Sequence, residues 1–317
     1  MEGHQQRRTV SIKTLDGILL EGWFWSTAEK APAIIMTHGL NCVKEMSLSE
    51  TAEAFHAAGY NVLLYDSRSI GGSGSLPRNQ IDPWQNCEDL LDVVSYTATQ
   101  PSVNPRQILL WGLSLGGTIS GCSAALDPRV AGVIMVCPIF TFIAADKRQS
   151  LFTHLAKDRA SQLRGTEPLT LPPFNKHGSN PAGYAGSGGP GGKEAYTLMR
   201  TAAERGHANF RDRITLQSFG KLALFRPRGL LVEMLDRTPV MMVVAEEDCI
   251  SLPGDQMAVF ERLVGEGKRV FVARGAGHMD VLAGQGFRGV LEAMLGFCDE
   301  VCRKGSNSSF VEDKDGC

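Results

Sequence analysis

A serine stands at the centre of the pattern that could carry chemistry in this chain. An apolar run at residues 108–113 leads directly into Gly112-Leu113-Ser114-Leu115-Gly116, which has the form G-x-S-x-G. In this pattern the serine occupies a sharp turn between a strand and a helix, and glycines flank it because side chains there would collide. Small residues at 117–126 predict that helix. We therefore interpret Ser114 as a nucleophile, because a chance glycine turn would lack this context.

A serine hydroxyl needs a general base to activate it, and the base needs an acid to orient it. Residues 239–245 form a continuous apolar run, typical of a buried parallel strand, and Asp248 follows that run. A helical pattern and a further strand at 269–273 then lead to His278. The order Ser114, Asp248, His278 is the order of the catalytic triad in α/β-hydrolases.

Three other carboxylates compete with Asp248 for the role of the acid. Glu246 and Glu247 stand at the strand end and not in the loop beyond it, and they suit solvent or the start of the next helix better. Asp280 is only two residues from His278, which makes it hard for its side chain to fold back onto the ring. We favour Asp248 and keep the others as alternatives.

A second loop offers donors for an oxyanion. The apolar strand at 33–36 ends in Thr37-His38-Gly39-Leu40. The backbone N–H of Leu40 and that of Leu115, the residue after the nucleophile, would form the oxyanion hole. His38 would then be structural and would hold this loop through its ring. Such chemistry requires no metal and no organic cofactor.

The elements around these residues alternate between strands and helices. This alternation predicts a mostly parallel sheet covered by helices on both faces. The predicted strands lie at 9–14 and 19–25, which form a hairpin, and near residues 33, 61, 107, 130, 239 and 269. The predicted helices span 47–58, 83–100, 117–126, 254–264 and 287–302.

An insertion interrupts this series between the sixth and seventh strands. We expect a core of residues 1–138 and 235–303, a helical cap at 139–234 with helices at 146–163, 193–207 and 216–224, and a disordered tail at 304–317. Within the cap, the glycine-rich residues 178–192 form either a mobile lid or a passive surface loop. Their G-x-G-x-x-G pattern does not indicate a dinucleotide site, because no strand enters it and Pro190 stands where a helix should begin.

Together these motifs resemble those of the fungal polyketide transferase family, whose members have the α/β-hydrolase fold and act as acyltransferases or thiohydrolases. The resemblance covers nearly the whole chain. It rests on His38-Gly39-Leu40-Asn41, Tyr65-Asp66-Ser67-Arg68, Gly71-Gly72-Ser73-Gly74, Asp82-Pro83-Trp84, the elbow at Ser114, Pro172-Pro173-Phe174-Asn175, Asn180-Pro181-Ala182-Gly183 and the segment 275–280. It implies the triad Ser114, Asp248 and His278, and a polyketide-type acyl thioester or ester as substrate, delivered by a carrier domain of a polyketide synthase.

Two other classes of function stay open on the same sequence. One is a non-hydrolytic enzyme of this fold that promotes cyclisation, elimination or C–C bond cleavage. The other is a ligand-binding protein without turnover.

We interpret Asp66 and Arg68 as a scaffold ion pair and not as catalytic groups.

Composition excludes some partners and indicates a compartment. A net charge of −2 and a pI near 6.4 give no basic footprint for nucleic acid. The first residues lack the apolar region of a signal peptide, and the apolar run at 130–145 is too short to span a bilayer comfortably. The eight cysteines are scattered without C-x-x-C pairs, as expected for buried thiols in a reducing compartment. We therefore expect a cytoplasmic enzyme without a membrane or metal partner, and we leave a homodimer open.

Overall fold

The structure is a computed structural model that describes residues 7–207, 209–284 and 286–307. Eight strands within these residues form one sheet in the order β1-β2-β4-β3-β5-β6-β9-β10. Their bounds are β1 Arg8–Lys13, β2 Leu19–Trp25, β3 Ala31–Thr37, β4 Asn61–Tyr65, β5 Val103–Leu113, β6 Val130–Val136, β9 Val240–Ala245 and β10 Arg269–Ala273. β1 and β2 form the expected antiparallel hairpin, β2 is antiparallel to β4, and all other neighbouring strands are parallel.

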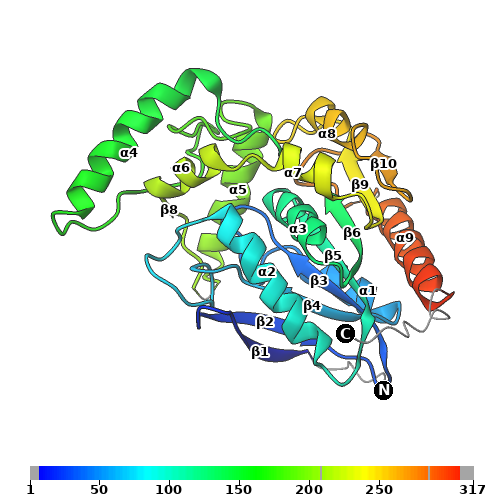
Figure 1. The fold of residues 1–317 in the computed structure, drawn as a ribbon. Coiled ribbons are helices and arrows are strands. Elements are labelled where there is room, and N and C mark those ends of the chain that lie inside the picture. Colours follow the sequence, from blue (N-terminus) through cyan, green and yellow to red (C-terminus); the bar gives the residue numbers. More distant parts are fainter. Residues whose placement is uncertain (1–6, 208, 285, 308–317) are drawn as a thin grey trace.

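Helices cover both faces of this sheet (Figure 1). The core helices are α1 Ser49–Ala57, α2 Pro83–Ala98, α3 Leu115–Leu126, α8 Pro253–Phe260 and α9 Phe287–Asn307. Leu90 of α2 and Ile119 of α3 pack in the apolar core on one face, whereas Phe55 of α1 and Met294 of α9 pack in the core on the other. Strands in the middle of the sheet, such as the wholly apolar β9, are buried along their whole length between the two helical layers. The predicted α/β-hydrolase fold is confirmed.

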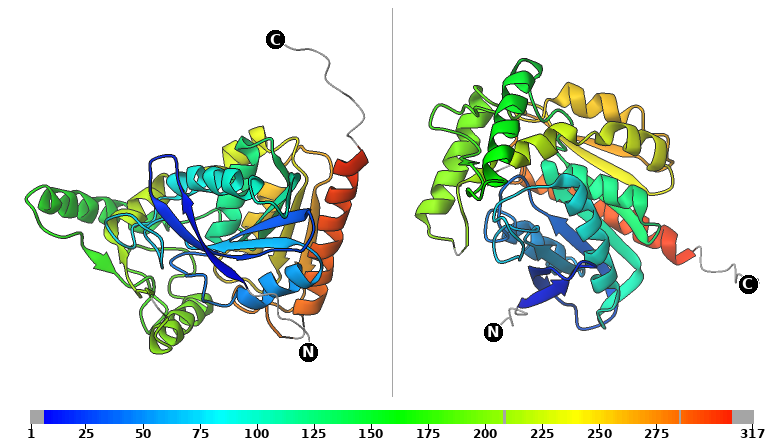
Figure 2. Two further views of the ribbon diagram at one scale, coloured as in Figure 1. Left: turned by 90° about the horizontal axis from the view of Figure 1, so that it is seen from below. Right: turned by 60° about the vertical axis from the view of Figure 1, so that its left-hand side comes forward.

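The insertion between β6 and β9, the sixth and seventh strands of the large sheet, is mainly helical. It contains a 3₁₀ turn at Ala145–Lys147, α4 Arg148–Gln162, β7 Thr170–Leu171, α5 Pro190–Glu204, β8 Ile214–Thr215, α6 Leu216–Leu224 and α7 Pro227–Met234. Figures 1 and 2 show α4, α5 and α6 gathered at one end of the sheet. α7 instead lies against α3, where Leu231 faces Gly121. The boundaries of the cap at 139 and 234 stay a prediction.

Several predicted element bounds are wrong. α5 begins at Pro190 and not at residue 193, because proline fits the first turn of a helix, where its missing N–H is not needed. Pro190 is therefore no argument against a helix at the predicted glycine-rich pattern. The other reason for excluding a dinucleotide site still applies, because no described strand leads into residues 186–191. α8 ends at Phe260, four residues early, and α7 was not predicted. α9 continues to Asn307, so residues 304–307 are helical, and the rest of the predicted tail lies outside the described residues.

The expected ion pair between Asp66 and Arg68 does not form, although both residues are structural. Arg68 pairs instead with Asp16 and Asp89, and Asp66 pairs with the ammonium of Lys44 at 2.8 Å. Asp66 also accepts hydrogen bonds from the backbone N–H groups of Lys44 and Gly72. It therefore ties the loop after β3 to the loop after β4.

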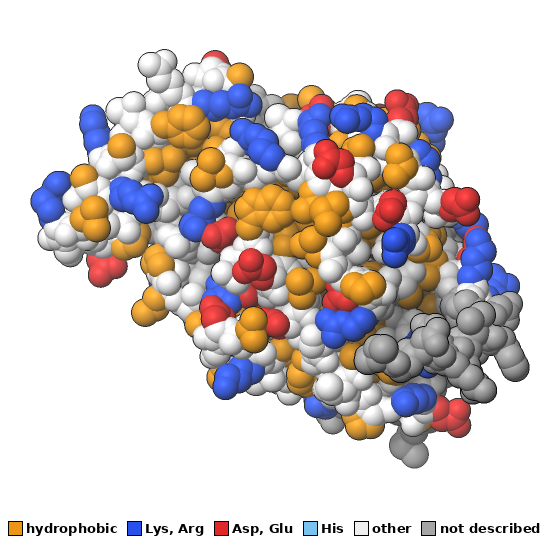
Figure 3. Space-filling model, viewed as in Figure 1, with side chains coloured by type: hydrophobic (Ala, Val, Ile, Leu, Met, Phe, Trp, Pro, Cys, Tyr) orange, Lys and Arg blue, Asp and Glu red, His pale blue; other side chains and the backbone are white. Residues whose placement is uncertain are grey.

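Surface charge is mixed on the face seen in Figure 3, where Lys and Arg side chains alternate with Asp and Glu and with apolar side chains. Among the helices of the described residues, none combines the length and apolar character needed to cross a membrane.

Candidate active site

Ser114 occupies the turn between β5, which ends at Leu113, and α3, which begins at Leu115. Its backbone has φ 58° and ψ −120°, a conformation that a non-glycine residue seldom adopts and that is typical of a nucleophile elbow. A Cβ at Gly112 would stand 2.2 Å from the carbonyl oxygen of Gly116, and one at Gly116 would stand 2.3 Å from that of Thr37. The two glycines are thus required by close packing, as the sequence predicts.

Asp248 and His278 come together from the loops after β9 and β10. His278 Nδ1 lies 2.7 Å from Asp248 Oδ2, and both side chains are buried. The other carboxylate oxygen, Oδ1, accepts hydrogen bonds from the backbone N–H groups of Ile250 at 2.8 Å and Ser251 at 2.7 Å. A carboxylate at Nδ1 favours the tautomer with its proton there, which leaves Nε2 as the basic nitrogen.

The alternative acids have other partners or lie at the surface. Glu246 pairs with Arg274 and accepts a hydrogen bond from the backbone N–H of Gly275. Asp280 Oδ1 accepts one from the backbone N–H of Gly277 at 2.5 Å, and Glu247 is exposed. Of the four acids that the sequence offered, Asp248 alone has a hydrogen bond to the His278 ring among the described contacts.

The loop after β3 lies against Ser114, since a Cβ at Gly39 would stand 3.5 Å from Ser114 Cβ. The His38 ring holds this loop, with Nε2 2.6 Å from the carbonyl oxygen of Met46 and Nδ1 accepting from the N–H of Gly39 at 2.8 Å. Burial lowers the pKa of His38 to about 4, so the ring is neutral at pH 7. Leu40 follows directly in this loop.

The second predicted oxyanion donor, the N–H of Leu115, belongs to the first turn of α3. Backbone N–H groups in the first turn of a helix have no acceptor within the helix, and they favour negative charge. The roles of Leu40 and Leu115 stay predictions.

Cys137 belongs to this site and was not singled out from the sequence. It directly follows β6 with φ 45°, and its sulfur, a carboxylate oxygen of Asp248 and a ring nitrogen of His278 all lie within 4.8 Å of one another. Burial, with the charge of Asp248 second, raises the pKa of the Cys137 thiol well above its usual value. Its position directly after β6, a neighbour of both β5 and β9, is the signal that could have indicated it.

A cluster of three carboxylates surrounds the ammonium group of a lysine. Oxygens of Glu21, Glu45 and Asp66 lie within 4.8 Å of one another, and Lys44 Nζ is 2.6, 2.9 and 2.8 Å from them in that order. The buried lysine supplies the positive charge that these three carboxylates require.

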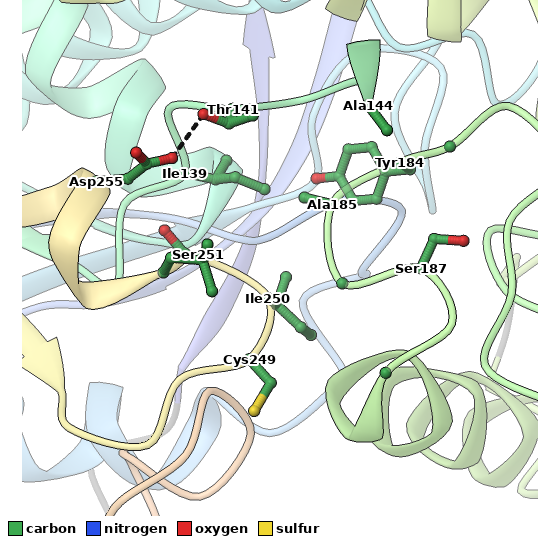
Figure 4. A pocket seen from close by; sticks show the side chains of 14 residues that line it. Ile139, Thr141, Ala144, Tyr184, Ala185, Ser187, Cys249, Ile250, Ser251 and Asp255 are labelled. Atoms are coloured by element: carbon green, nitrogen blue, oxygen red, sulfur yellow. Dashed lines mark hydrogen bonds between the residues drawn. The ribbon is translucent and has the colours of Figure 1, made fainter. Parts of the chain in front are cut away.

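A cavity of about 320 Å³ is lined jointly by the cap and by the acid loop, the loop after β9 that carries Asp248 (Figure 4). Cys249, Ile250 and Ser251 line one side of it, and Tyr184 and Ser187 from the glycine-rich segment line the other. Figure 4 also shows the hydrogen bond from Thr141 to Asp255 at its rim.

Cys249 is exposed, so the expectation that all cysteines are buried is wrong there, and Cys317 lies outside the described residues.

The fold, the elbow and the pair of Asp248 and His278 define a hydrolase-type site, and comparison with known proteins gives the family. Residues 34–291 match the alpha/beta hydrolase family, and the chain belongs to it.

Two similar proteins and one solved structure narrow this assignment. A thiohydrolase from Eupenicillium brefeldianum is 37% identical over 304 residues, which cover 96% of this chain and 97% of that protein. Polyketide transferase af380 from Aspergillus fumigatus is 36% identical over 292 residues, covering 92% and 97%. The structure of DcsB in complex with its substrate analogue superposes with a TM-score of 0.90 at 49% identity, covering 93% of this chain and 99% of that one. The resemblance to the fungal polyketide transferases and thiohydrolases is confirmed.

Proposed function

We propose that the protein is a serine-dependent acyl hydrolase or acyltransferase that acts on a polyketide-type acyl thioester or ester in secondary-metabolite biosynthesis. The observation that carries the proposal is the contact of 2.7 Å between Asp248 and His278. It lies at the carboxyl ends of the parallel strands, the same end of the sheet at which Ser114 forms the nucleophile elbow. Relatives named thiohydrolase and polyketide transferase support acyl transfer as the reaction class.

In the proposed mechanism, Ser114 Oγ attacks the carbonyl carbon while His278 Nε2 takes the hydroxyl proton. The N–H groups of Leu40 and Leu115 stabilise the oxyanion of the tetrahedral intermediate. Collapse of this intermediate breaks the C–S or C–O bond, and the imidazolium returns its proton to the leaving group. Water or an alcohol then attacks acyl-Ser114 while His278 Nε2 takes its proton. Collapse of this second tetrahedral intermediate breaks the bond between the acyl carbon and Ser114 Oγ, which receives the proton back from His278, and an acid or an ester is released.

Treatment with a fluorophosphonate, followed by intact-protein mass measurement, tests the nucleophile. The wild type should gain one label, and Ser114→Ala should gain none and lose turnover of an acyl thioester by roughly a thousand-fold or more. Cys249→Ala is the matched control, since Cys249 is an exposed nucleophile near the acid loop. Its labelling should equal that of the wild type.

Turnover that survives in Ser114→Ala would contradict the covalent mechanism and favour the non-hydrolytic reading, in which the pocket promotes cyclisation, elimination or C–C cleavage. Binding of acyl compounds without turnover in the wild type would favour a ligand-binding protein. Four further expectations remain predictions. They are delivery of the substrate by a polyketide synthase carrier domain, a homodimer, the cytoplasmic location, and the lack of nucleic-acid and membrane partners.

A further inference from the structure

A second cavity, of about 360 Å³, lies where the loop after β4 meets the cap segment between α5 and β8. Residues 71–74 and Arg78 line it from the core, and Asn209, Phe210 and Arg211 line it from the cap. Two arginines, one from the core and one from the cap, therefore line the same open cavity, and their charges act on each other.

These two arginines lack a carboxylate partner among the described residues. The negative charge of Asp66 acts on Arg78 through space, but the Asp66 carboxylate is already paired with the ammonium of Lys44 at 2.8 Å. Burial, together with the nearby Arg211, lowers the pKa of Arg78. Asp212 adjoins Arg211 in sequence, and the charges that act on its carboxylate are those of Arg200 and Arg213. The cavity thus holds positive charge that an anion would neutralise.

Hydrogen bonds hold the core side of this cavity in place. Arg78 donates hydrogen bonds to the carbonyl oxygens of Ser73 and Gly71, which fixes its planar group and leaves further N–H donors, since a guanidinium has five. Gly71 has φ 52°, and a Cβ there would stand 2.1 Å from Asp66 Oδ2. The glycine loop is therefore held close to Asp66, and Arg78 is held on the loop.

Two buried amides join both arginine-bearing segments to the predicted oxyanion loop. Asn41, next to Leu40, donates from Nδ2 to the carbonyl oxygen of Arg211 at 2.9 Å. Its Oδ1 accepts from Asn79 Nδ2 at 2.8 Å, and Asn79 adjoins Arg78. A ligand held by the two arginines would thus be anchored to the loop that faces the reacting carbonyl.

We propose that this cavity binds the phosphate of a phosphopantetheine arm that presents the acyl thioester to Ser114. This inference rests on the proposed thioester substrate. Phosphate is an anion whose oxygens match the planar donor fork of arginine. The arm carries its thioester at one end and its phosphate at the other, joined by a flexible linker, so the two sites would recognise its two ends. Coenzyme A and a carrier domain present the same arm.

The test compares two thioesters of one acyl chain, octanoyl-phosphopantetheine and octanoyl-N-acetylcysteamine, the second of which has no phosphate. Arg211→Gln should raise KM for the first by roughly ten-fold, because a charge-assisted hydrogen bond is lost, and should leave turnover of the second unchanged. Arg211 is exposed, so this variant should fold normally. Arg226→Gln is the matched control, because Arg226 is also exposed and lines a different cavity.

An equal loss on both thioesters, or an equal effect of Arg226→Gln, overturns the proposal. Octanoyl-coenzyme A and an octanoyl-carrier domain distinguish the two sources of the arm, and selective weakening by Arg211→Gln with either one supports the proposal. Calorimetry of phosphopantetheine binding to Ser114→Ala distinguishes a failure of this inference from a failure of the proposed function, because binding does not require turnover. Binding there that Arg211→Gln weakens supports the cavity even if catalysis fails, whereas absence of binding overturns it.

Discussion

Gly191 of the cap lies directly against Ile250 of the loop that carries Asp248. A Cβ at Gly191 would stand 2.5 Å from Ile250 Cγ1, and one at Gly186 would stand 2.8 Å from the same atom. The backbone N–H of Ile250 in turn donates to Asp248 Oδ1 at 2.8 Å. The glycine-rich segment therefore contacts the residue whose backbone N–H holds the proposed catalytic acid.

Gly191→Ala should lower kcat for an acyl thioester by roughly ten- to a hundred-fold, because displacing Ile250 moves the Asp248 carboxylate away from His278. Steady-state kinetics on the purified variant measure this effect. Gly189→Ala is the matched control from the same segment, since a Cβ there would meet its nearest atom at an ordinary 3.6 Å. Equal rates in the two variants would show that the acid loop does not depend on this contact.

Asp248→Asn should reduce kcat by roughly a thousand-fold or more, because an amide at this position favours the wrong tautomer of His278. Glu247→Gln and Asp280→Asn should keep most of the wild-type rate, since the contact with the His278 ring comes from Asp248. A larger loss in Asp280→Asn than in Asp248→Asn would transfer the acid role to Asp280. Kinetics of the three variants with one thioester decide the ranking.

Lys44→Met should destabilise the fold by about 3–5 kcal/mol, because it leaves the buried carboxylate of Asp66 without its counter-charge. Urea unfolding followed by circular dichroism measures the free energy. Adding Asp66→Asn to Lys44→Met should recover part of the loss, since the unpaired charge is then removed. Arg288→Gln, which breaks an exposed pair with Glu292, should cost less than about 1 kcal/mol. A similar small loss for Lys44→Met would contradict the role assigned to this lysine.

Stability should rise between about pH 4 and pH 6.5 through His38. Burial lowers its folded-state pKa to about 4, so in this range the unfolded chain binds more protons than the native protein. The stabilisation is present above the unfolded pKa, near 6.5, and is lost as the pH falls toward 4; its full size is about 3 kcal/mol. Protonation of Nδ1 would also remove the acceptor for the Gly39 N–H.

Urea unfolding at pH 4.5, 5.5 and 7 tests this dependence, and His38→Gln should flatten the slope relative to the wild type. His177→Gln is the matched control, because that side chain is exposed. An identical slope in the wild type and His38→Gln would show that other groups set the acid sensitivity.

The alternation of apolar strands and amphipathic helices was sufficient to predict the sheet, because its central strands are continuous apolar runs, such as residues 240–245, that are buried between the helices. Ser114 and His278 were also predictable, since Ser114 directly follows β5 in a recognisable turn and His278 lies in the loop after β10. The bounds of α5 and α9 were less predictable. Pro190 is compatible with either a loop or a first helical turn, and tertiary packing decides between them.

The sequence by itself determined the strand order along the chain, the elbow at Ser114 and the short set of acids that could orient His278, because these depend on neighbours a few residues away. Only the tertiary structure decided which acid contacts His278, that Cys137 lies beside this pair and that Asp66 pairs with Lys44 and not with Arg68. The physical reason is that such contacts join loops far apart in the chain. Their geometry is set by how strands, helices and cap pack, and no local pattern records it.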